Sequence, residues 1–156
     1  MTADRIAITR EPLESADAQT LIAALNAELD ARYPEEGANH FRLDPDEVAP
    51  GRGAFVIARL DGRPVACGAV RRGGDDCAEI KRMYVDPSAR GHGLGRRVLA
   101  ALEVEAGLLG ARRLLLETGA RQHEAVGLYV AAGYVVVDRF GAYLDSPLSL
   151  CMGKDL

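Results

Sequence analysis

The sequence has no tryptophan, few other aromatic residues and only three cysteines. Its 156 residues include 5 tyrosines and 3 phenylalanines, while 48% are hydrophobic and 27% are charged. Cys67, Cys77 and Cys151 are far apart, odd in number and lack the spacing of metal ligands. We therefore expect reduced thiols, and neither a disulfide framework nor a metal site, in a chain of ordinary globular composition.

Basic residues are not in excess. The chain has 19 Lys and Arg against 23 Asp and Glu, a net charge of −4. This balance argues against a general nucleic-acid binder, because neutralising phosphates needs a basic surface. Neither a signal peptide nor an apolar run of membrane-spanning length is present. We expect a soluble, cytoplasmic protein without a nucleic-acid or membrane partner.

The length is typical of one domain, and no repeat, linker or low-complexity segment divides the chain. We therefore expect a single domain over residues 1–156. A short β-prone run at 6–8 precedes apolar residues at helical spacing within 15–33. Between 34 and 53, three prolines and few apolar residues predict a loop with room for one short helix.

The strongest hairpin signal is Asp61-Gly62, which separates β-prone runs at 54–60 and 63–72. Asp-Gly supplies the positive φ angles of a tight two-residue turn. A third strand at 77–85 ends at Asp86-Pro87, because proline cannot donate to a strand ladder. The first half of the chain therefore predicts an antiparallel meander.

The second half predicts a parallel crossover. A helix with Leu94, Val98, Leu102 and Leu109 on one face precedes a strand at 111–118, whose continuous apolar centre suggests burial on both sides. A strand, a helix and a strand in this order form a parallel pair. A second helix, bearing an apolar face from 125 to 132, leads to strands at 134–138 and 148–154 that we expect to pair as a hairpin.

A glycine-rich loop, ARGHGLGRR at residues 89–97, joins the third strand to the helix. Its backbone N–H groups can converge on an anion, and the helix that starts there adds the positive end of its dipole. The loop therefore predicts a phosphate or pyrophosphate site. A Walker loop is excluded because no Lys-Ser or Lys-Thr follows, and the glycines give G-x-G-x-G instead of the dinucleotide G-x-G-x-x-G.

What fits is R-x-x-G-x-G, formed by Arg90, Gly93 and Gly95 directly after a strand that ends in Met-Tyr-Val. This pattern resembles the GCN5-related N-acetyltransferase (GNAT) superfamily, whose members hold the pyrophosphate of coenzyme A with this loop. The family's second pattern, N-x-x-A-x-x-L-Y-x-x-x-G-F, is similar to Gln122, Ala125, Leu128, Tyr129, Gly133 and Tyr134. Gln replaces the usual Asn and Tyr replaces Phe.

The resemblance implies an α+β (mixed α/β) fold: a central mixed sheet of about seven strands, with an antiparallel N-terminal meander, a splayed parallel central pair and about four helices on both faces. It implies a bulge near Met83 or Tyr84 that opens a slot for the pantetheine arm. The cofactor-binding residues that it implies are Met83, Tyr84, Val85, Arg90, Gly91, His92, Gly93, Leu94, Gly95, Arg96 and Gln122. Without a bulge, Glu79, Lys81, Met83 and Val85 would share one face of the strand.

The implied activity is acetyl transfer from acetyl-CoA to a primary amine by direct attack, with a small-molecule or peptide acceptor and no metal. An alkylamine such as lysine has a pKa of about 10.4, so a base must take its proton. Glu79 is the candidate base, acting through a water, and a salt bridge to a neighbouring Arg or Lys is the alternative. Tyr129 is the candidate acid for the departing thiolate, and a core tyrosine is the alternative.

Two further expectations concern partners. The loop before the second strand contains several acidic residues, which either attract a cationic amine or are simply solvated. They are Glu35, Glu36, Asp44, Asp46 and Glu47. The resemblance also makes a homodimer through the end strands plausible. The alternative to an enzyme is a non-catalytic acyl-CoA-binding sensor or interaction module with the same fold.

Overall fold

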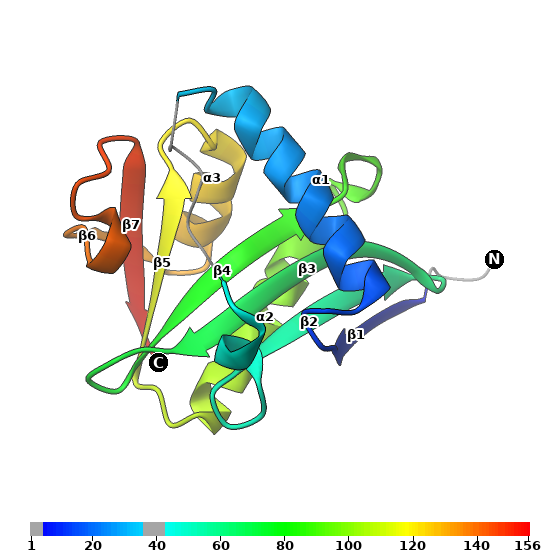
Figure 1. Cartoon of the computed structure of the whole chain (residues 1–156), viewed down its shortest axis with the longest axis horizontal. Coiled ribbons are helices and arrows are strands. Elements are labelled where there is room, and N and C mark those ends of the chain that lie inside the picture. The colour runs from blue at the N-terminus through cyan, green and yellow to red at the C-terminus, as the bar shows by residue number, and fades with distance from the viewer. Residues whose placement is uncertain (1–4, 36–42) are drawn as a thin grey trace.

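Seven strands form one mixed sheet in the computed structural model, which describes residues 5–35 and 43–156. The strands lie in the order β1-β2-β3-β4-β5-β7-β6 (Figure 1). Their bounds are β1 Ile6–Arg10, β2 Gly53–Leu60, β3 Arg63–Arg72, β4 Cys77–Val85, β5 Arg113–Gly119, β6 Val135–Val137 and β7 Ser149–Asp155. The β4 and β5 strands are parallel, and every other neighbouring pair is antiparallel. The predicted sheet, with its meander, parallel pair and terminal hairpin, is confirmed.

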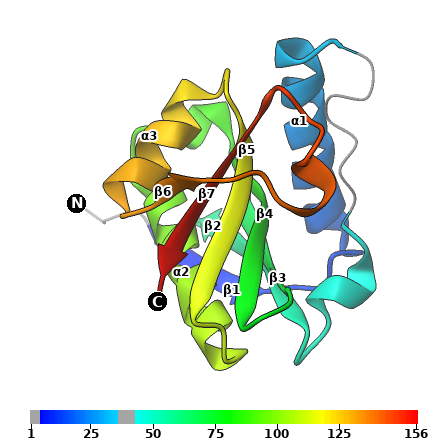
Figure 2. The same ribbon diagram turned by 90° about the vertical axis from the view of Figure 1, so that its left-hand side faces the viewer.

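The helices cover both faces of this sheet. Helix α1 (Ala16–Arg32) lies on one face, and α2 (Leu94–Leu108) and α3 (His123–Ala131) lie on the other (Figure 2). We expected about four helices, whereas the described residues form three α-helices. Three short 3-10 helices accompany them: η1 Pro45–Val48, η2 Pro87–Ala89 and η3 Gly141–Tyr143. None of the helices in the described ranges is long and apolar enough to cross a membrane.

Local signals in the sequence account for the element boundaries. The Ser15 hydroxyl accepts a 3.1 Å hydrogen bond from the Ala18 N–H, which satisfies an amide in the first turn of α1. Asp61 and Gly62 have φ angles of 50° and 84°, as a tight two-residue hairpin turn requires. Gly110 follows α2 with a φ of 83°, a backbone region that favours glycine.

The core has two parts, one on each face of the sheet. On the face covered by α2, Val98 and Leu102 pack with Ile80 and Leu116 of the central strands. On the face covered by α1, helix residues such as Leu21 pack with Phe55, Ile57 and Tyr84. Residues of the central strand β4 therefore belong to either part of the core: Ile80 faces α2, and Tyr84 faces α1.

A β-bulge interrupts this alternation in β4. Cys67 of β3 pairs with Tyr84 and Ala69 pairs with Lys81, so Gly68 alone lies opposite two residues, Arg82 and Met83. Arg82 has a φ of 59°, and its carbonyl accepts a hydrogen bond from the Cys67 thiol at 3.3 Å. The expected bulge is thus present. It moves Met83 and Val85 to the face of Ile80 and α2, away from the face that they would share with Glu79 and Lys81 in a regular strand.

The parallel pair separates just before the bulge. Pairing between β4 and β5 runs from Cys77 and Arg113 to Ile80 and Leu116, and it ends there. Beyond this point β5 pairs only with β7, and β4 pairs only with β3. The two central strands consequently diverge toward their carboxyl ends, as the resemblance implies.

Candidate active site

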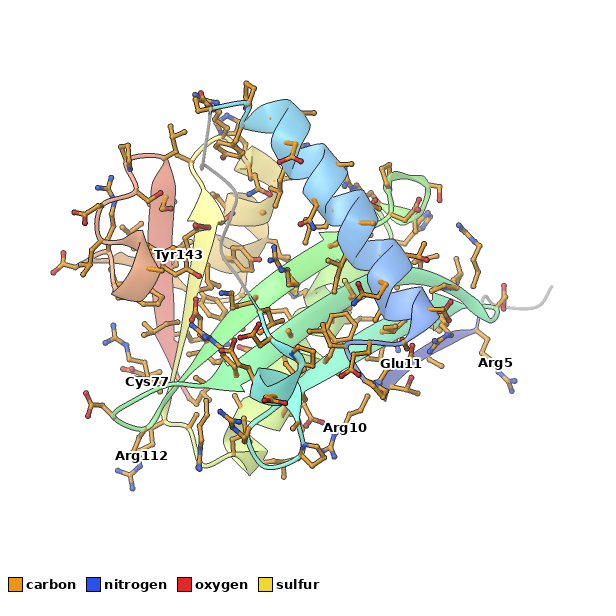
Figure 3. All side chains as sticks on the ribbon, viewed as in Figure 1. Arg5, Arg10, Glu11, Cys77, Arg112 and Tyr143 are labelled. Atoms are coloured by element: carbon orange, nitrogen blue, oxygen red, sulfur yellow. The ribbon has the colours of Figure 1, made fainter. Side chains whose placement is uncertain are left out.

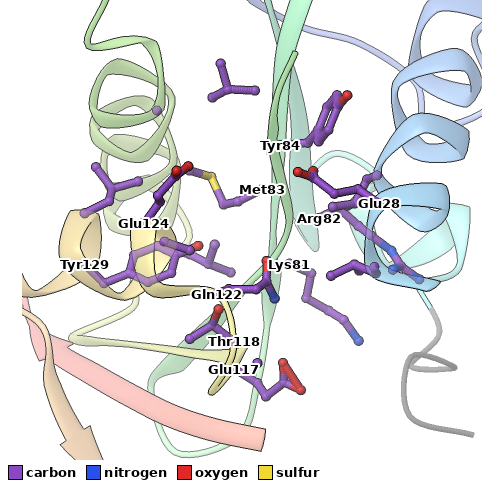
Figure 4. A pocket seen from close by; sticks show the side chains of 18 of the residues that line it. Glu28, Lys81, Arg82, Met83, Tyr84, Glu117, Thr118, Gln122, Glu124 and Tyr129 are labelled. Carbon is purple, nitrogen blue, oxygen red and sulfur yellow. The ribbon is translucent and has the colours of Figure 1, made fainter. Parts of the chain in front are cut away.

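A pocket of about 490 Å³ lies where the central strands separate. Its walls come from the C-terminal half of α1, the second half of β4, the glycine loop, the end of β5, helix α3 and the segment from η3 to the start of β7. Figure 4 shows several of these side chains. The carboxyl ends of neighbouring parallel strands are a common site for ligands in α/β sheets. All of the predicted site residues except Glu79 and His92 line this pocket.

The glycine loop forms one end of the pocket. Gly91 and Gly93 have φ angles of 86° and 74°, and Gly93 occupies the N-cap of α2. No side chain caps this helix, and the amides of its first turn have no acceptor within the helix. These N–H groups, together with the positive end of the helix dipole, can hold a phosphate group. The geometry therefore fits the predicted pyrophosphate site.

Gly95 allows this helix end to approach its neighbours. A Cβ atom added there would lie 3.2 Å from Leu128 Cδ2 and 3.6 Å from Val85 Cγ2. In the R-x-x-G-x-G pattern, Gly93 thus supplies a positive φ and Gly95 allows close approach. The arginine of the pattern holds the loop in place. The Arg90 guanidinium binds the Glu28 carboxylate at 2.8 Å and the Val85 carbonyl at 2.9 Å. Arg90 therefore ties the loop to α1 and β4.

Arg96, Gln122 and His92 are the other predicted cofactor-binding residues near this end of the pocket. Arg96 is exposed at the rim of the pocket, and Gln122 lines it at the N-cap of α3 without a side-chain capping bond. His92 is exposed and does not line the pocket. The structure therefore brings together the loop glycines, Gln122 and the second half of β4, but leaves His92 outside.

Glu79 is buried, with 6% of its surface exposed, and it does not line the pocket. Its carboxylate accepts hydrogen bonds from Arg71 at 2.7 Å and from the Tyr143 hydroxyl at 2.6 Å. Arg71 also binds Glu47. This arrangement matches the salt-bridge interpretation of Glu79, since its oxygen atoms serve a network that joins β3, β4, η1 and η3.

Glu117, near the end of β5, is a carboxylate that the sequence interpretation missed. It is half-buried, lines the pocket and accepts a 2.9 Å hydrogen bond from the Ser149 hydroxyl. Burial raises its pKa, and the charge of Glu79 adds to this rise, while the Ser149 bond and the charges of Lys81 and Arg82 oppose it. The signal available in the sequence was its place at the carboxyl end of a strand predicted to run parallel to β4.

Tyr129 lines the opposite wall, on α3 (Figure 4). Only 4% of its surface is exposed, and its ring packs edge-on against that of Tyr134. No group within the described parts of the chain hydrogen-bonds to its hydroxyl. Burial and the negative charge of Glu117 raise the pKa of Tyr129, so the hydroxyl keeps its proton at neutral pH. The pocket thus contains a protonated phenol and a carboxylate.

Comparison with known proteins identifies the family and agrees with this fold. The sequence model of the acetyltransferase (GNAT) family matches residues 18–134. An IAA acetyltransferase of Azospirillum brasilense is 43% identical over 155 residues, which cover 97% of this chain and 98% of that protein. The chain therefore belongs to the GNAT acetyltransferases, as the resemblance implied. This membership and the near full-length similarity support the predicted N-acetyltransferase enzyme.

Solved structures show the same architecture. A Klebsiella pneumoniae protein assigned to the acyl-CoA N-acyltransferases superposes with a TM-score of 0.82 at 35% identity, covering 97% of both chains. A GNAT acetyltransferase of Elizabethkingia anophelis, solved with acetyl-CoA bound, superposes with a TM-score of 0.70 at 16% identity. That match covers 99% of this chain and all of the other, and it shows a shared fold.

Proposed function

We propose that this enzyme transfers an acetyl group from acetyl-CoA to a primary amine by direct attack. One observation carries the proposal: a protonated phenol, Tyr129, and a carboxylate with a raised pKa, Glu117, line one pocket. The same pocket extends to the uncapped N-terminus of α2. An acid, a base and an anion site are the groups that this reaction needs.

The chain offers a matching surface for each part of the donor. The amides of Gly91 to Arg96 are suited to the pyrophosphate. From Lys81 to Val85, the edge of β4 that faces β5 has no strand partner. An extended pantetheine arm can therefore pair with the backbone of Met83 and Val85 as an additional strand would. This arrangement directs the thioester toward Tyr129 and Glu117.

Glu117 is the base that we assign. Its raised pKa makes it a better proton acceptor than an exposed carboxylate, while it remains ionised above that pKa. It takes the proton of the acceptor ammonium, and the freed nitrogen lone pair attacks the thioester carbonyl. The N–C bond forms and the C–S bond breaks. Tyr129 then donates its proton to the departing thiolate. The acetylated nitrogen loses its second proton, which returns the proton to Tyr129, and the proton held by Glu117 passes to solvent, so the products are an N-acetylated amine and a free thiol.

Glu79 is a weaker candidate for the base. Its bonds to Arg71 and Tyr143 occupy both carboxylate oxygens, and its side chain does not line the pocket. We propose that Glu79 positions Tyr143, which does line the pocket, and that Glu117 acts on the amine.

The test is thiol release from acetyl-CoA, measured across a panel of primary amines with hydrolysis of acetyl-CoA alone as the background. We expect amine-dependent release that falls roughly 100- to 10,000-fold in kcat for Glu117→Gln, with a smaller change in KM for acetyl-CoA. Tight binding of coenzyme A without turnover on any amine would refute the proposed reaction. Unchanged kcat in Glu117→Gln would refute the assignment of the base alone.

A further inference from the structure

We propose that the amine acceptor carries a carboxylate close to its amino group, and that Lys81 and Arg82 bind this carboxylate. The inference rests on the proposed function, since it describes the second substrate of the same site. It goes beyond that function because it defines a chemical class, the amino acids and related aminocarboxylates. The placement of two cations beside Glu117 supports it.

The bulge in β4 places both cationic side chains on the α1 side of the pocket. Consecutive residues of a regular strand point to opposite faces of the sheet. Here Arg82 adopts a φ of 59°, and its Nη1 lies 3.5 Å from Asn26 Oδ1 of α1. Lys81 and Arg82 both extend toward α1, whereas Met83 extends toward the opposite side, which α2 and α3 cover (Figure 4). The pocket wall next to α1 therefore carries two adjacent positive charges.

These two cations lie at the middle of β4, whereas the glycine loop follows the end of this strand. The last parallel pair is Ile80 and Leu116, so Lys81 and Arg82 come immediately after the point where the strands separate. Glu117 holds the equivalent place on β5. A group bound by Lys81 and Arg82 is therefore next to the proposed base, whereas the donor's pyrophosphate belongs at the opposite end.

The charges at this end match those of a zwitterion. Lys81 and Arg82 are close enough to Glu117 for their charges to oppose the rise in its pKa. An ammonium group facing Glu117 and a carboxylate facing the two cations would pair each charge of an amino acid with its opposite. Both cations are half-buried, and desolvation lowers the pKa of each. A bound carboxylate would add charge-assisted hydrogen bonds to the interactions that these side chains already make.

Other charged residues near the pocket do not offer the same match. Glu28 lines the α1 wall, but it binds Arg90 at 2.8 Å and Arg32 at 3.3 Å. The acidic loop residues considered as attractors of a cationic amine also lie elsewhere. Glu35 binds Arg121, and Glu47 binds Arg71. None of Glu35, Asp44, Asp46 and Glu47 lines the pocket. Glu36 is outside the described residues.

The experiment compares α-amino acids with their primary amides as acceptors, at saturating acetyl-CoA. Each pair shares a side chain and differs only in the carboxylate. The amide has the less basic amino group, which is more easily deprotonated, so a preference for the free acid cannot come from amine basicity. We expect the best free acid to exceed its amide by at least about ten-fold in kcat/KM.

Variants then connect that preference to the two cations. In the double variant Lys81→Met with Arg82→Gln, we expect the ratio of acid to amide to fall to about one. The charge-keeping variants Lys81→Arg and Arg82→Lys should retain the ratio, as should Arg112→Gln. Arg112 is exposed, does not line the pocket and projects outward from the edge of the molecule (Figure 3).

The outcomes separate this inference from the proposed function. Acetyl transfer to amines without a preference for the acid would overturn the acceptor class and leave the reaction intact. The same conclusion follows if the double variant keeps the wild-type ratio of acid to amide. If no amine, whether free acid or amide, accepts the acetyl group, then the reaction and the acceptor class both fall.

Discussion

The hydroxyl of Tyr143 donates a 2.6 Å hydrogen bond to Glu79, which joins the segment between β6 and β7 to the middle of β4. Arg71, directly opposite Glu79 in the register of β3 and β4, binds the same carboxylate. These two bonds hold the buried Glu79 side chain in place. Tyr143 also lines the pocket, so this network supports one of its walls.

Replacing Glu79 with Gln should reduce stability more than it reduces the chemical step. The substitution leaves the half-buried Arg71 with Glu47 as its remaining ion-pair partner, and it weakens the bond from Tyr143. We expect a loss of about 1–3 kcal/mol in the free energy of unfolding, measured by urea denaturation. Tyr143→Phe should lose less, about 1 kcal/mol. A fully stable Glu79→Gln variant with a large loss of kcat would instead identify Glu79 as the base.

The pH dependence of kcat/KM should reveal a carboxyl with a raised pKa. Burial raises the pKa of Glu117 above its ordinary value of 4.5, and the proposed base is active only when ionised. Activity should therefore rise with pH through an inflection above that value. The inflection should be absent from the residual activity of Glu117→Gln. An inflection that persists unchanged in this variant would assign the titration to another group.

The same carboxyl should affect stability with the opposite sign. Since folding raises the pKa of Glu117, the folded state holds this proton more tightly than the unfolded chain does. The resulting stabilisation is complete below the unfolded pKa and is lost as pH rises through the folded pKa. Urea denaturation should thus show Glu117→Gln becoming more stable relative to the wild type as pH rises across this interval. A constant difference would contradict the raised pKa.

Tyr129→Phe should lose activity without losing stability. The Tyr129 hydroxyl has no hydrogen-bond partner in the described ranges, so its removal breaks no internal bond. We expect kcat to fall roughly 100-fold or more while thermal denaturation changes little. Tyr134→Phe is the matched control, because the Tyr134 hydroxyl donates to Glu103 at 3.1 Å and lies outside the pocket lining. It should cost about 1 kcal/mol in stability and leave kcat unchanged.

Gly91→Ala should weaken coenzyme A binding, whereas Gly51→Ala should not. Both glycines have similar φ angles, 86° and 82°, and no atom lies within 4 Å of an added Cβ at either. Each substitution should therefore cost a similar backbone strain of about 1 kcal/mol. Only Gly91 lines the pocket. Isothermal titration with coenzyme A should show a higher Kd for Gly91→Ala alone, and equal Kd values would place the pyrophosphate elsewhere.

The sequence was sufficient for features that depend on local chemistry. Asp61-Gly62, the Ser15 cap and the glycines before α2 each impose a backbone conformation by their own side chain or its absence. The positions of these elements, and the mixed sheet that they build, follow from such signals and from the crossover rule. Ten of the eleven cofactor-binding residues that the resemblance implied line the pocket, and His92 does not.

The parts that the sequence could not supply depend on tertiary contacts. Glu117 comes next to Lys81 only because the crossover places β5 beside β4, and nothing near Glu117 in the chain indicates that it borders a pocket. The role of Glu79 likewise depends on the register that sets Arg71 opposite it and on Tyr143, 64 residues away. Strand alternation alone also misplaced Met83, because the bulge adds a residue to one strand.

The bulge also makes the pocket depend on the number of residues in β4. Deleting one residue between Lys81 and Tyr84 would remove the bulge and restore a regular strand. The residues up to Lys81 and the residues from Tyr84 onward could then no longer both keep their present pairing with β3. Either Tyr84 would leave the core beneath α1, or Lys81 would turn away from the pocket. A conservative substitution in β4 can therefore keep both the core and the pocket, whereas a change in the length of this strand cannot.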